Sequence, residues 1–330
     1  MTTATLTRQI YYTRCPAPTA TGVGAGLGVL QKALEASGFA PSALQDVTDP
    51  EIRRHHFEHG IANLIREGGN IPAIWPKSRG ARTRLLGITW LDEIQAIVVR
   101  PNSGFQSIRD LASARFAVPV SAGDRLDVAG ISAFRGIDQA LGTIGRQLSD
   151  VNLVEVAHRP TPPGERGGEH FDDELEALEN GRVDAVWLKS AVGAAAIISG
   201  RVRPVLRLDH VVNPLVRVNN GTPRTLTFHE DFIADHPQAV RAVLSAVTEA
   251  VHAIGEDRQK LWAILAGETG QSAADAEIAF GSFSTANLLP TLAENRLEAL
   301  QHQADFLFRQ GFIPNDVDVR QWALHQDDNA

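Results

Sequence analysis

The chain has 330 residues and a net charge of −8, and a length of this order predicts about two domains and a sizeable core. Hydrophobic residues make up 43% and charged residues 21%, as in ordinary globular proteins, and the acidic balance with scattered basic residues argues against nucleic acid as the main partner. A single cysteine excludes an intrachain disulfide framework and a multi-thiolate metal site within one chain.

The first predicted strand, Leu6–Thr13, ends just before the single cysteine, Cys15. Two prolines and a glycine-rich stretch follow, and they lead into a predicted helix over Gly28–Ser37. A thiol at a strand-to-helix turn is held by rigid elements, and the positive end of the following helix would favour its thiolate. A buried cysteine that acts only as a small hydrophobic side chain is an equally open interpretation of the position alone.

The next helix is predicted to begin at Asp49-Pro50-Glu51, which supplies an N-cap, a proline at the first helical position and an acidic residue in the first turn. This helix carries His55 and His56, and His59 follows. The spacing of His55 and His59 places both on one helix face, yet no carboxylate or further histidine is placed to complete a metal site, so no metal is expected. A histidine-rich face in contact with solvent is the alternative.

The rest of the chain alternates strand-like and helix-like segments, which predicts α/β layers with mostly parallel strands. The further predicted strands are Arg84–Thr89, Gln95–Arg100, Arg115–Val120, Val151–Val156, Val183–Leu188 and Pro204–Leu208. The further predicted helices are Ile108–Ala112, Val128–Gln147, Phe171–Asn180, Ala239–Ile254, Lys260–Ala266, Ala273–Phe280 and Glu294–Gln310. The segment from His158 to His170 is rich in proline and glycine and is predicted to be a loop.

This order of elements predicts two α/β lobes between which the chain crosses twice. One lobe would comprise residues 1–100 and 211–330, and the other residues 101–210. We expect a ligand cleft between the lobes, because inter-lobe clefts are favoured binding sites.

Two levels of resemblance to known proteins support this prediction. The segments 83–89, 97–104 and 108–112 resemble the type II periplasmic-binding-protein fold of nitrate, sulfonate and taurine receptors. A narrower resemblance covers most of the chain, and it is to the 2'-hydroxybiphenyl-2-sulfinate desulfinases. Its segments are Tyr12-Thr13-Arg14-Cys15-Pro16-Ala17-Pro18, His56-Phe57, Arg66 ten residues after the histidine, Gly68-Gly69-Asn70-Ile71-Pro72, Phe306-Leu307 and Gln321-Trp322-Ala323.

The desulfinase resemblance implies hydrolysis of an aryl sulfinate to the arene and sulfite, with no metal and no organic cofactor. It implies that Cys15 carries the catalytic thiol, that His56 orients or activates it, and that Arg66 holds the sulfinate. It also implies that the backbone N–H near Gly69 helps to hold the sulfinate. The other substrate-binding residues that we predict are Gly68 in the same turn, Phe57 as an apolar wall for the ring, and His59. His59 stands where the family pattern has an aromatic phenol, so the choice among aryl or alkyl sulfinates stays open.

The residue types suit this chemistry. The planar fork of an arginine can hold both sulfinate oxygens, and a tight turn at Gly68-Gly69 would bring backbone N–H groups close to them. Cys15 has two candidate roles. Its thiolate can attack the sulfur, or its thiol can protonate the ring carbon while water captures SO₂. The first role needs a depressed thiol pKa, and the second needs a thiol that stays protonated near neutral pH.

The alternative is a non-catalytic binding protein of the same fold for a sulfonate, nitrate or similar anion, because fold does not fix function. Such a protein is typically exported, whereas the N-terminus lacks the positive segment and apolar stretch of a signal peptide. No apolar run is long enough to span a membrane. We therefore expect a cytoplasmic protein, a monomer, whose partner is a small anionic sulfinate and neither nucleic acid nor a membrane.

Overall fold

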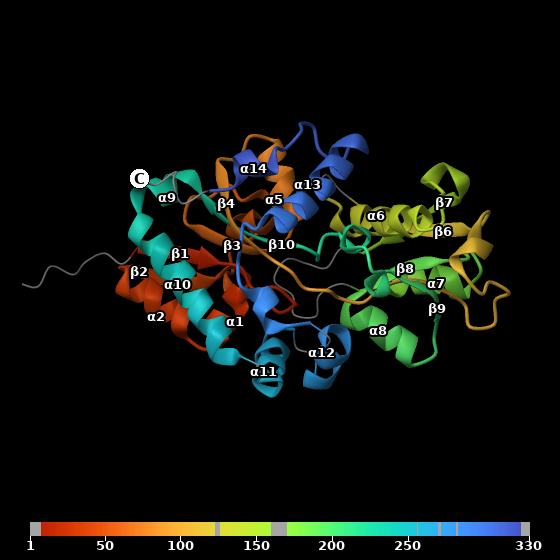
Figure 1. The fold of residues 1–330 in the computed structure, drawn as a ribbon, viewed down its shortest axis with the longest axis horizontal. Helices are drawn as coiled ribbons and strands as arrows, with labels where there is room; N and C mark the ends of the chain where they lie inside the picture. Colours follow the sequence, from red (N-terminus) through yellow and green to blue (C-terminus); the bar gives the residue numbers. More distant parts are fainter. Residues whose placement is uncertain are drawn as a thin grey trace, which may run out of the picture.

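A computed structural model describes residues 8–122, 126–159, 170–255, 257–269, 272–281 and 283–324. The described chain forms two α/β lobes, the first built around a five-stranded sheet and the second around a three-stranded sheet and a two-stranded pair (Figure 1). The first sheet has the strand order β2-β1-β3-β10-β4. Its strands are β1 (Arg8–Tyr12), β2 (Phe39–Ala43), β3 (Leu64–Gly69), β4 (Thr83–Thr89) and β10 (Arg224–His229). β1 pairs in parallel with β2 and β3, whereas β10 lies antiparallel between β3 and β4.

Helices from both ends of the sequence belong to the first lobe (Figure 1). They are α1 (Ala20–Gly26), α2 (Val29–Ala36), α3 (Pro50–Arg53), α4 (His55–Glu58), α5 (Ile71–Ser78), α9 (Glu230–Asp235), α10 (Pro237–Ile254), α11 (Arg258–Thr269), α13 (Glu294–Arg309) and α14 (Val319–Trp322). The helices α1, α2 and α10 pack together, and α2 and α10 each present an apolar stripe. Ile10 of β1, Leu30 of α2 and Val247 of α10 meet in one buried core.

The second lobe contains β5 (Gln95–Val99) between β8 (Val186–Lys189) and β9 (Arg203–Arg207), with both neighbours antiparallel. The parallel pair β6 (Arg115–Ser121) and β7 (Asn152–His158) is joined to β8 through a bridge from Phe116 to Ala185. The helices of this lobe are α6 (Val128–Gly142), α7 (Asp172–Glu179) and α8 (Ser190–Ile198). Every residue of β5 is buried, in line with its continuous apolar sequence.

The chain passes between the sheets through segments 90–94 and 208–223. Because β5 pairs only with strands of the second lobe, the first crossing comes before Gln95, ahead of the predicted boundary at residue 100. Helix α12 (Ala273–Phe280) adds a further link, since it packs against α8. The elements around both crossings therefore lie at the junction of the lobes.

Two details of the elements differ from the sequence prediction. The helix predicted from Asp49 divides into α3 and α4, although Asp49 caps α3 through the N–H of Glu51 as expected. Most of the predicted proline-rich loop, residues 160–169, lies outside the described residues. Among the helices that the structure describes, none combines the length and apolar character needed to cross a membrane.

Candidate active site

The loop that carries Cys15 is fixed to β3 and to the segment after β2. The hydroxyl of Thr13 donates to the carbonyl of Glu67 at 2.8 Å and accepts from its N–H at 2.9 Å. The N–H of Arg14 donates to the side chain of Gln45 at 3.0 Å. Cys15 is thereby held at the carboxyl end of β1, the edge of a sheet at which α/β proteins bind ligands. The thiol is half-buried, which leaves part of it accessible.

Gly68 lies between the thiol and Arg66. A Cβ atom built on Gly68 would lie 3.8 Å from the Sγ of Cys15 and 3.9 Å from Nη2 of Arg66. Gly68 and Arg66 share one face of β3, because side chains two positions apart on a strand point the same way. The absence of a side chain at Gly68 therefore leaves room for a small group between a thiol and a guanidinium.

The guanidinium of Arg66 is buried and aimed by two backbone carbonyls. Its Nε donates to the carbonyl of His56 at 2.9 Å, and its Nη2 donates to that of Gly69 at 3.1 Å. Its Nη1 is buried and has no hydrogen-bond partner within the described part of the chain. Burial lowers the pKa of Arg66 to about 10, so the group stays positively charged near neutral pH. A buried donor without a partner costs free energy, and an oxygen of a bound anion would satisfy it.

The structure links His56 to the thiol indirectly, through Arg66. The His56 carbonyl accepts the bond from Arg66, while its ring packs edge-on against Phe57 with centroids 4.8 Å apart. Burial and the nearby charge of Arg66 lower the pKa of His56 to about 3, so the ring is neutral at physiological pH. Its predicted activation of Cys15, and the substrate contact of Phe57, stay predictions.

His59 fixes the turn between α4 and β3. It is buried, with a φ of 45°, and its Nε2 and Nδ1 lie 3.2 Å from the carbonyl of Leu64 and 3.3 Å from the hydroxyl of Thr227. Burial, reinforced by the charge of Arg66, lowers its pKa to about 3. Both ring nitrogens thus have protein partners, and the predicted contact of His59 with substrate stays a prediction.

Gly68 and Gly69 end strand β3 and do not form the expected tight turn. They pair with Thr225 and Arg224 of β10, a strand that the sequence analysis did not predict. A Cβ atom on Gly69 would lie 2.6 Å from Oδ1 of Asn220, so only glycine fits there without a shift. The same Asn220 oxygen accepts the N–H of Ile71 at the start of α5 at 3.0 Å, which occupies a backbone donor near the glycines.

The helix that follows Cys15 is predicted over Gly28–Ser37, whereas the structure already begins a helix, α1, at Ala20 within the glycine-rich stretch. The N–H groups of Ala20 and Thr21, at the start of α1, donate to the carboxylate of Glu67 at 3.1 and 2.7 Å. The positive end of α1 is therefore satisfied by a buried carboxylate and is not available to a thiolate of Cys15.

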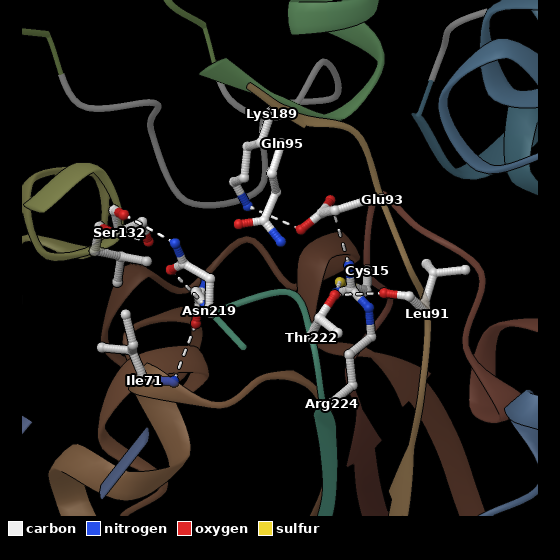
Figure 2. Close-up of polar contacts among 12 residues, drawn as sticks. Cys15, Ile71, Leu91, Glu93, Gln95, Ser132, Lys189, Asn219, Thr222 and Arg224 are labelled. Carbon is white, nitrogen blue, oxygen red and sulfur yellow. Dashed lines mark hydrogen bonds and ion pairs between the residues drawn. The ribbon is translucent and has the colours of Figure 1, made fainter. Parts of the chain in front are cut away.

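The partner of the thiol is Arg224, at the start of β10. Its Nη1 donates to Sγ of Cys15 at 3.0 Å (Figure 2). Glu93 lies 3.8 Å from Nη2 of Arg224, and Nζ of Lys189 lies 3.6 Å from the other oxygen of Glu93. All three side chains are buried. The alternation Thr-Leu-Thr-Phe after Arg224 is a strand pattern that would have drawn attention to this residue.

These charges compete with burial in setting the acidity of the thiol. Burial is the largest effect and raises the pKa of Cys15 above its usual value. The positive charges of Arg224, Arg66 and Lys189 act in the opposite direction, and the negative charge of Glu93 adds to the rise. The net direction is upward, so the thiol is protonated near neutral pH in this arrangement.

The two histidines that share one helix face, His55 and His59, have protein partners in the structure. Nδ1 of His55 accepts the N–H of Gly60 at 3.2 Å, and both nitrogens of His59 have protein partners. Among the described residues, the ligand atoms of His158, His170 and Asp173 in the second lobe lie within 4.8 Å of one another.

The atoms of this second-lobe group have protein partners of their own. His158 lies 2.8 Å from the buried carboxylate of Glu174, and Asp173 accepts from the backbone and guanidinium of Arg159. These contacts form a hydrogen-bonded and ionic network, and among the described residues no contact links this network to Cys15.

Comparisons with known proteins agree with this arrangement. No family model matches the chain. The 2'-hydroxybiphenyl-2-sulfinate desulfinases of Rhodococcus erythropolis and Rhodococcus qingshengii are each 25% identical over 346 aligned positions, which cover 94% of this chain and 90% of the relative. The resemblance to this family is thereby confirmed.

Solved structures confirm the fold. The desulfurization enzyme DszB, a cysteine-to-serine mutant in complex with biphenyl-2-sulfinic acid, aligns with a TM-score of 0.75 and 23% identity over 98% of both chains. The alkanesulfonate-binding protein SsuA from Xanthomonas axonopodis pv. citri, bound to MOPS, aligns with a TM-score of 0.65 and 17% identity over 96% of this chain and 98% of SsuA. The predicted two-lobed periplasmic-binding-protein-like fold is therefore correct.

Proposed function

We propose that the chain is a cofactor-free desulfinase, a hydrolase that cleaves the carbon–sulfur bond of an aryl or related sulfinate and releases sulfite. The observation that carries the proposal is the buried Arg66, whose Nη1 has no hydrogen-bond partner among the described residues, beside the free thiol of Cys15. The space over Gly68 separates the two groups. The curated relatives, named as sulfinate desulfinases and aligned over almost the whole chain, support the same reaction.

In this proposal Arg66 binds the sulfinate and Cys15 takes part in the reaction. A sulfinate oxygen would accept a charge-assisted hydrogen bond from Nη1 of Arg66, whose other nitrogens keep the guanidinium in place. The reacting carbon and sulfur would then lie over Gly68, within reach of Sγ. Because the guanidinium is already oriented by two carbonyls, little ordering is needed when the anion binds.

The raised pKa of Cys15 favours the route in which the thiol is the proton donor. In that route the thiol proton is transferred to the ring carbon, and the electron pair of the carbon–sulfur bond stays with the ring, so that the arene and SO₂ are formed. Water then adds to SO₂ to give hydrogen sulfite and a proton, and the thiolate is reprotonated. The thiolate is stabilised in the interval by the hydrogen bond from Arg224.

In the second route the thiolate attacks the sulfinate sulfur, the ring carbon leaves with the bonding pair and takes a proton, and water releases sulfite from the sulfur adduct. This route requires deprotonation of Cys15 before the reaction. Arg66, Arg224 and Lys189 favour that step, whereas burial and Glu93 oppose it.

Sulfite release from a panel of aryl and alkyl sulfinates tests the proposal. The wild type should release sulfite and Cys15→Ser should not, while Cys15→Ser should still bind the sulfinate, because Arg66 is untouched. The alternative function is a non-catalytic receptor for a sulfonate or similar anion, which the shared fold with SsuA favours. A wild type that binds sulfinates and releases no sulfite from any member of the panel would establish that alternative.

We further propose that the protein acts as a cytoplasmic monomer on a small anionic substrate. Equilibrium sedimentation of the purified chain at micromolar concentration tests the oligomeric state, and a dimer mass would contradict it.

A further inference from the structure

A buried chain of charges leads away from the thiol to the second lobe. Arg224 contacts Sγ of Cys15, Glu93 lies beside Arg224, and Lys189 lies beside Glu93 (Figure 2). The exposed fractions of Arg224, Glu93 and Lys189 are only 4%, 3% and 6%. Charges are rarely buried unless they are paired, and breaking such a pair leaves an uncompensated charge. The three charged side chains therefore form a buried, mutually paired cluster and not a chance contact at the surface.

The members of the chain come from different parts of the fold. Arg224 begins β10 of the first lobe, Glu93 lies in the first crossing segment, and Lys189 ends β8 of the second lobe. Glu93 is shared, with one oxygen nearer Arg224 and the other nearer Lys189. The position of the second lobe is thus tied to the charge that lies against the thiol.

We infer that Arg224 is a catalytic residue that stabilises the thiolate of Cys15, and that Glu93 and Lys189 are positioning residues that hold Arg224 and set its effect. The inference rests on the proposed function for its role in turnover, but the acidity of the thiol can be measured without any substrate. Arg66 also faces Cys15. The described charges that act on the thiol are therefore Arg224, Arg66, Lys189 and Glu93.

Removal of each of these charges should shift the pKa of the Cys15 thiol in a definite direction. Loss of Arg224 or Lys189 removes a positive charge and should raise the thiol pKa, whereas loss of the negative charge of Glu93 should lower it. A neighbouring opposite charge shifts a pKa by about one unit or more, so Arg224→Met should slow alkylation roughly tenfold at any pH below both midpoints. Lys189 lies beyond Glu93, and the effect of Lys189→Met should be smaller.

The test is the rate of iodoacetamide labelling of the full chain between pH 6 and 11, followed by mass spectrometry. Because Cys15 is the only cysteine, all labelling reports on this thiol. The variants are Arg224→Met, Glu93→Gln and Lys189→Met, and Arg224→Lys should keep part of the effect because it retains the charge. Arg82→Met is the matched control, since Arg82 is mostly exposed and pairs with Asp231 at 2.8 Å.

We expect the labelling midpoint to rise in Arg224→Met and Lys189→Met, to fall in Glu93→Gln, and to stay in place in Arg82→Met. A purely structural role would loosen the site in the same direction for all three variants, and that outcome would overturn the inference. If Arg224→Met does not fold, the opposite shifts of the Glu93 and Lys189 variants decide.

The labelling result is independent of sulfite release. A protein that shows the expected signs and releases no sulfite would refute the desulfinase proposal and support the role of Arg224. If the protein releases sulfite and Arg224→Met has the same labelling midpoint as the wild type, the inference is refuted and the desulfinase proposal stands.

Discussion

We predict opposite effects on stability and activity when each of the two adjacent glycines at the end of β3 is replaced by alanine. At Gly68 the new methyl group would lie 3.8 Å from Sγ of Cys15 and 3.9 Å from Nη2 of Arg66, which are ordinary van der Waals distances. The fold should therefore tolerate Gly68→Ala, and relief of the glycine entropy cost even adds about 0.5–1 kcal/mol of stability. The methyl group, however, fills the space that a sulfinate would occupy.

At Gly69 the new methyl group would lie 2.6 Å from Oδ1 of Asn220, a distance that real side chains do not show. Asn220 must then move and lose its bond to the N–H of Ile71. Overpacking costs about 1–3 kcal/mol and loss of a helix cap about 1 kcal/mol, so Gly69→Ala should lower the free energy of unfolding by about 2–4 kcal/mol.

Urea unfolding and sulfite release, measured on both variants and the wild type, separate the two effects. Gly68→Ala should be at least as stable as the wild type, with a gain of up to about 1 kcal/mol, and should lose activity by on the order of 100-fold, because a displacement of about 1 Å has that effect on a positioned reaction. The main effect of Gly69→Ala should be the lower free energy of unfolding. A Gly68→Ala variant with near wild-type kcat/KM would refute the placement of the reacting sulfur over Gly68, and an undisturbed Gly69→Ala variant would refute the position of Asn220.

Two further substitutions test the surroundings of the site. Arg66→Lys cannot keep the bonds to the carbonyls of His56 and Gly69 and still offer a third donor. Loss of a charged hydrogen bond of about 1.5–3 kcal/mol should therefore lower kcat/KM for sulfinates roughly 10- to 100-fold, and an unchanged kcat/KM in sulfite-release kinetics would contradict this role. Folding lowers the pKa of His59 from 6.5 to about 3, so the unfolded chain takes up a proton at higher pH than the folded chain does. The contribution of neutral His59 to the free energy of unfolding is therefore complete above about pH 6.5 and is lost as the pH falls toward 3. His59→Asn, which tolerates the positive φ, should flatten that loss by up to about 1.4 kcal/mol per pH unit in urea unfolding at pH 5 to 7, and an identical pH slope in both proteins would count against it.

Much of the fold follows from the sequence because its signals are local. The apolar runs of β4 and β5, the N-cap at Asp49 and the apolar stripe of α10 are all recognised within a few neighbouring residues. Strand β3 is different, since Arg66-Glu67-Gly68-Gly69 has charged and glycine residues where a strand pattern expects apolar ones. These residues stay in a strand because β10 pairs with them, and that partner lies more than 150 residues away in the sequence.

The same distinction applies to the site. Cys15 and Arg66 are found from the sequence because they lie in short segments that resemble a known family. Arg224, Glu93 and Lys189 lie in no such segment, and only the two crossings between the lobes bring them to the thiol. The alternation after Arg224 is a local signal for strand β10, but long-range charge pairing leaves no periodic signal, so the contact of Arg224 with the thiol and with its charged partners could not be predicted from local patterns.

The position of β10 between β3 and β4 also affects the order in which the sheet can form during synthesis on the ribosome. Strands β3 and β4 are synthesised first and cannot complete their sheet until residue 229 has emerged, after the whole second lobe. Until then two strand edges lack their partner, a state that invites association with other chains. Arg224 arrives with the same strand, so the nascent protein acquires the neighbour of its thiol only when this sheet closes.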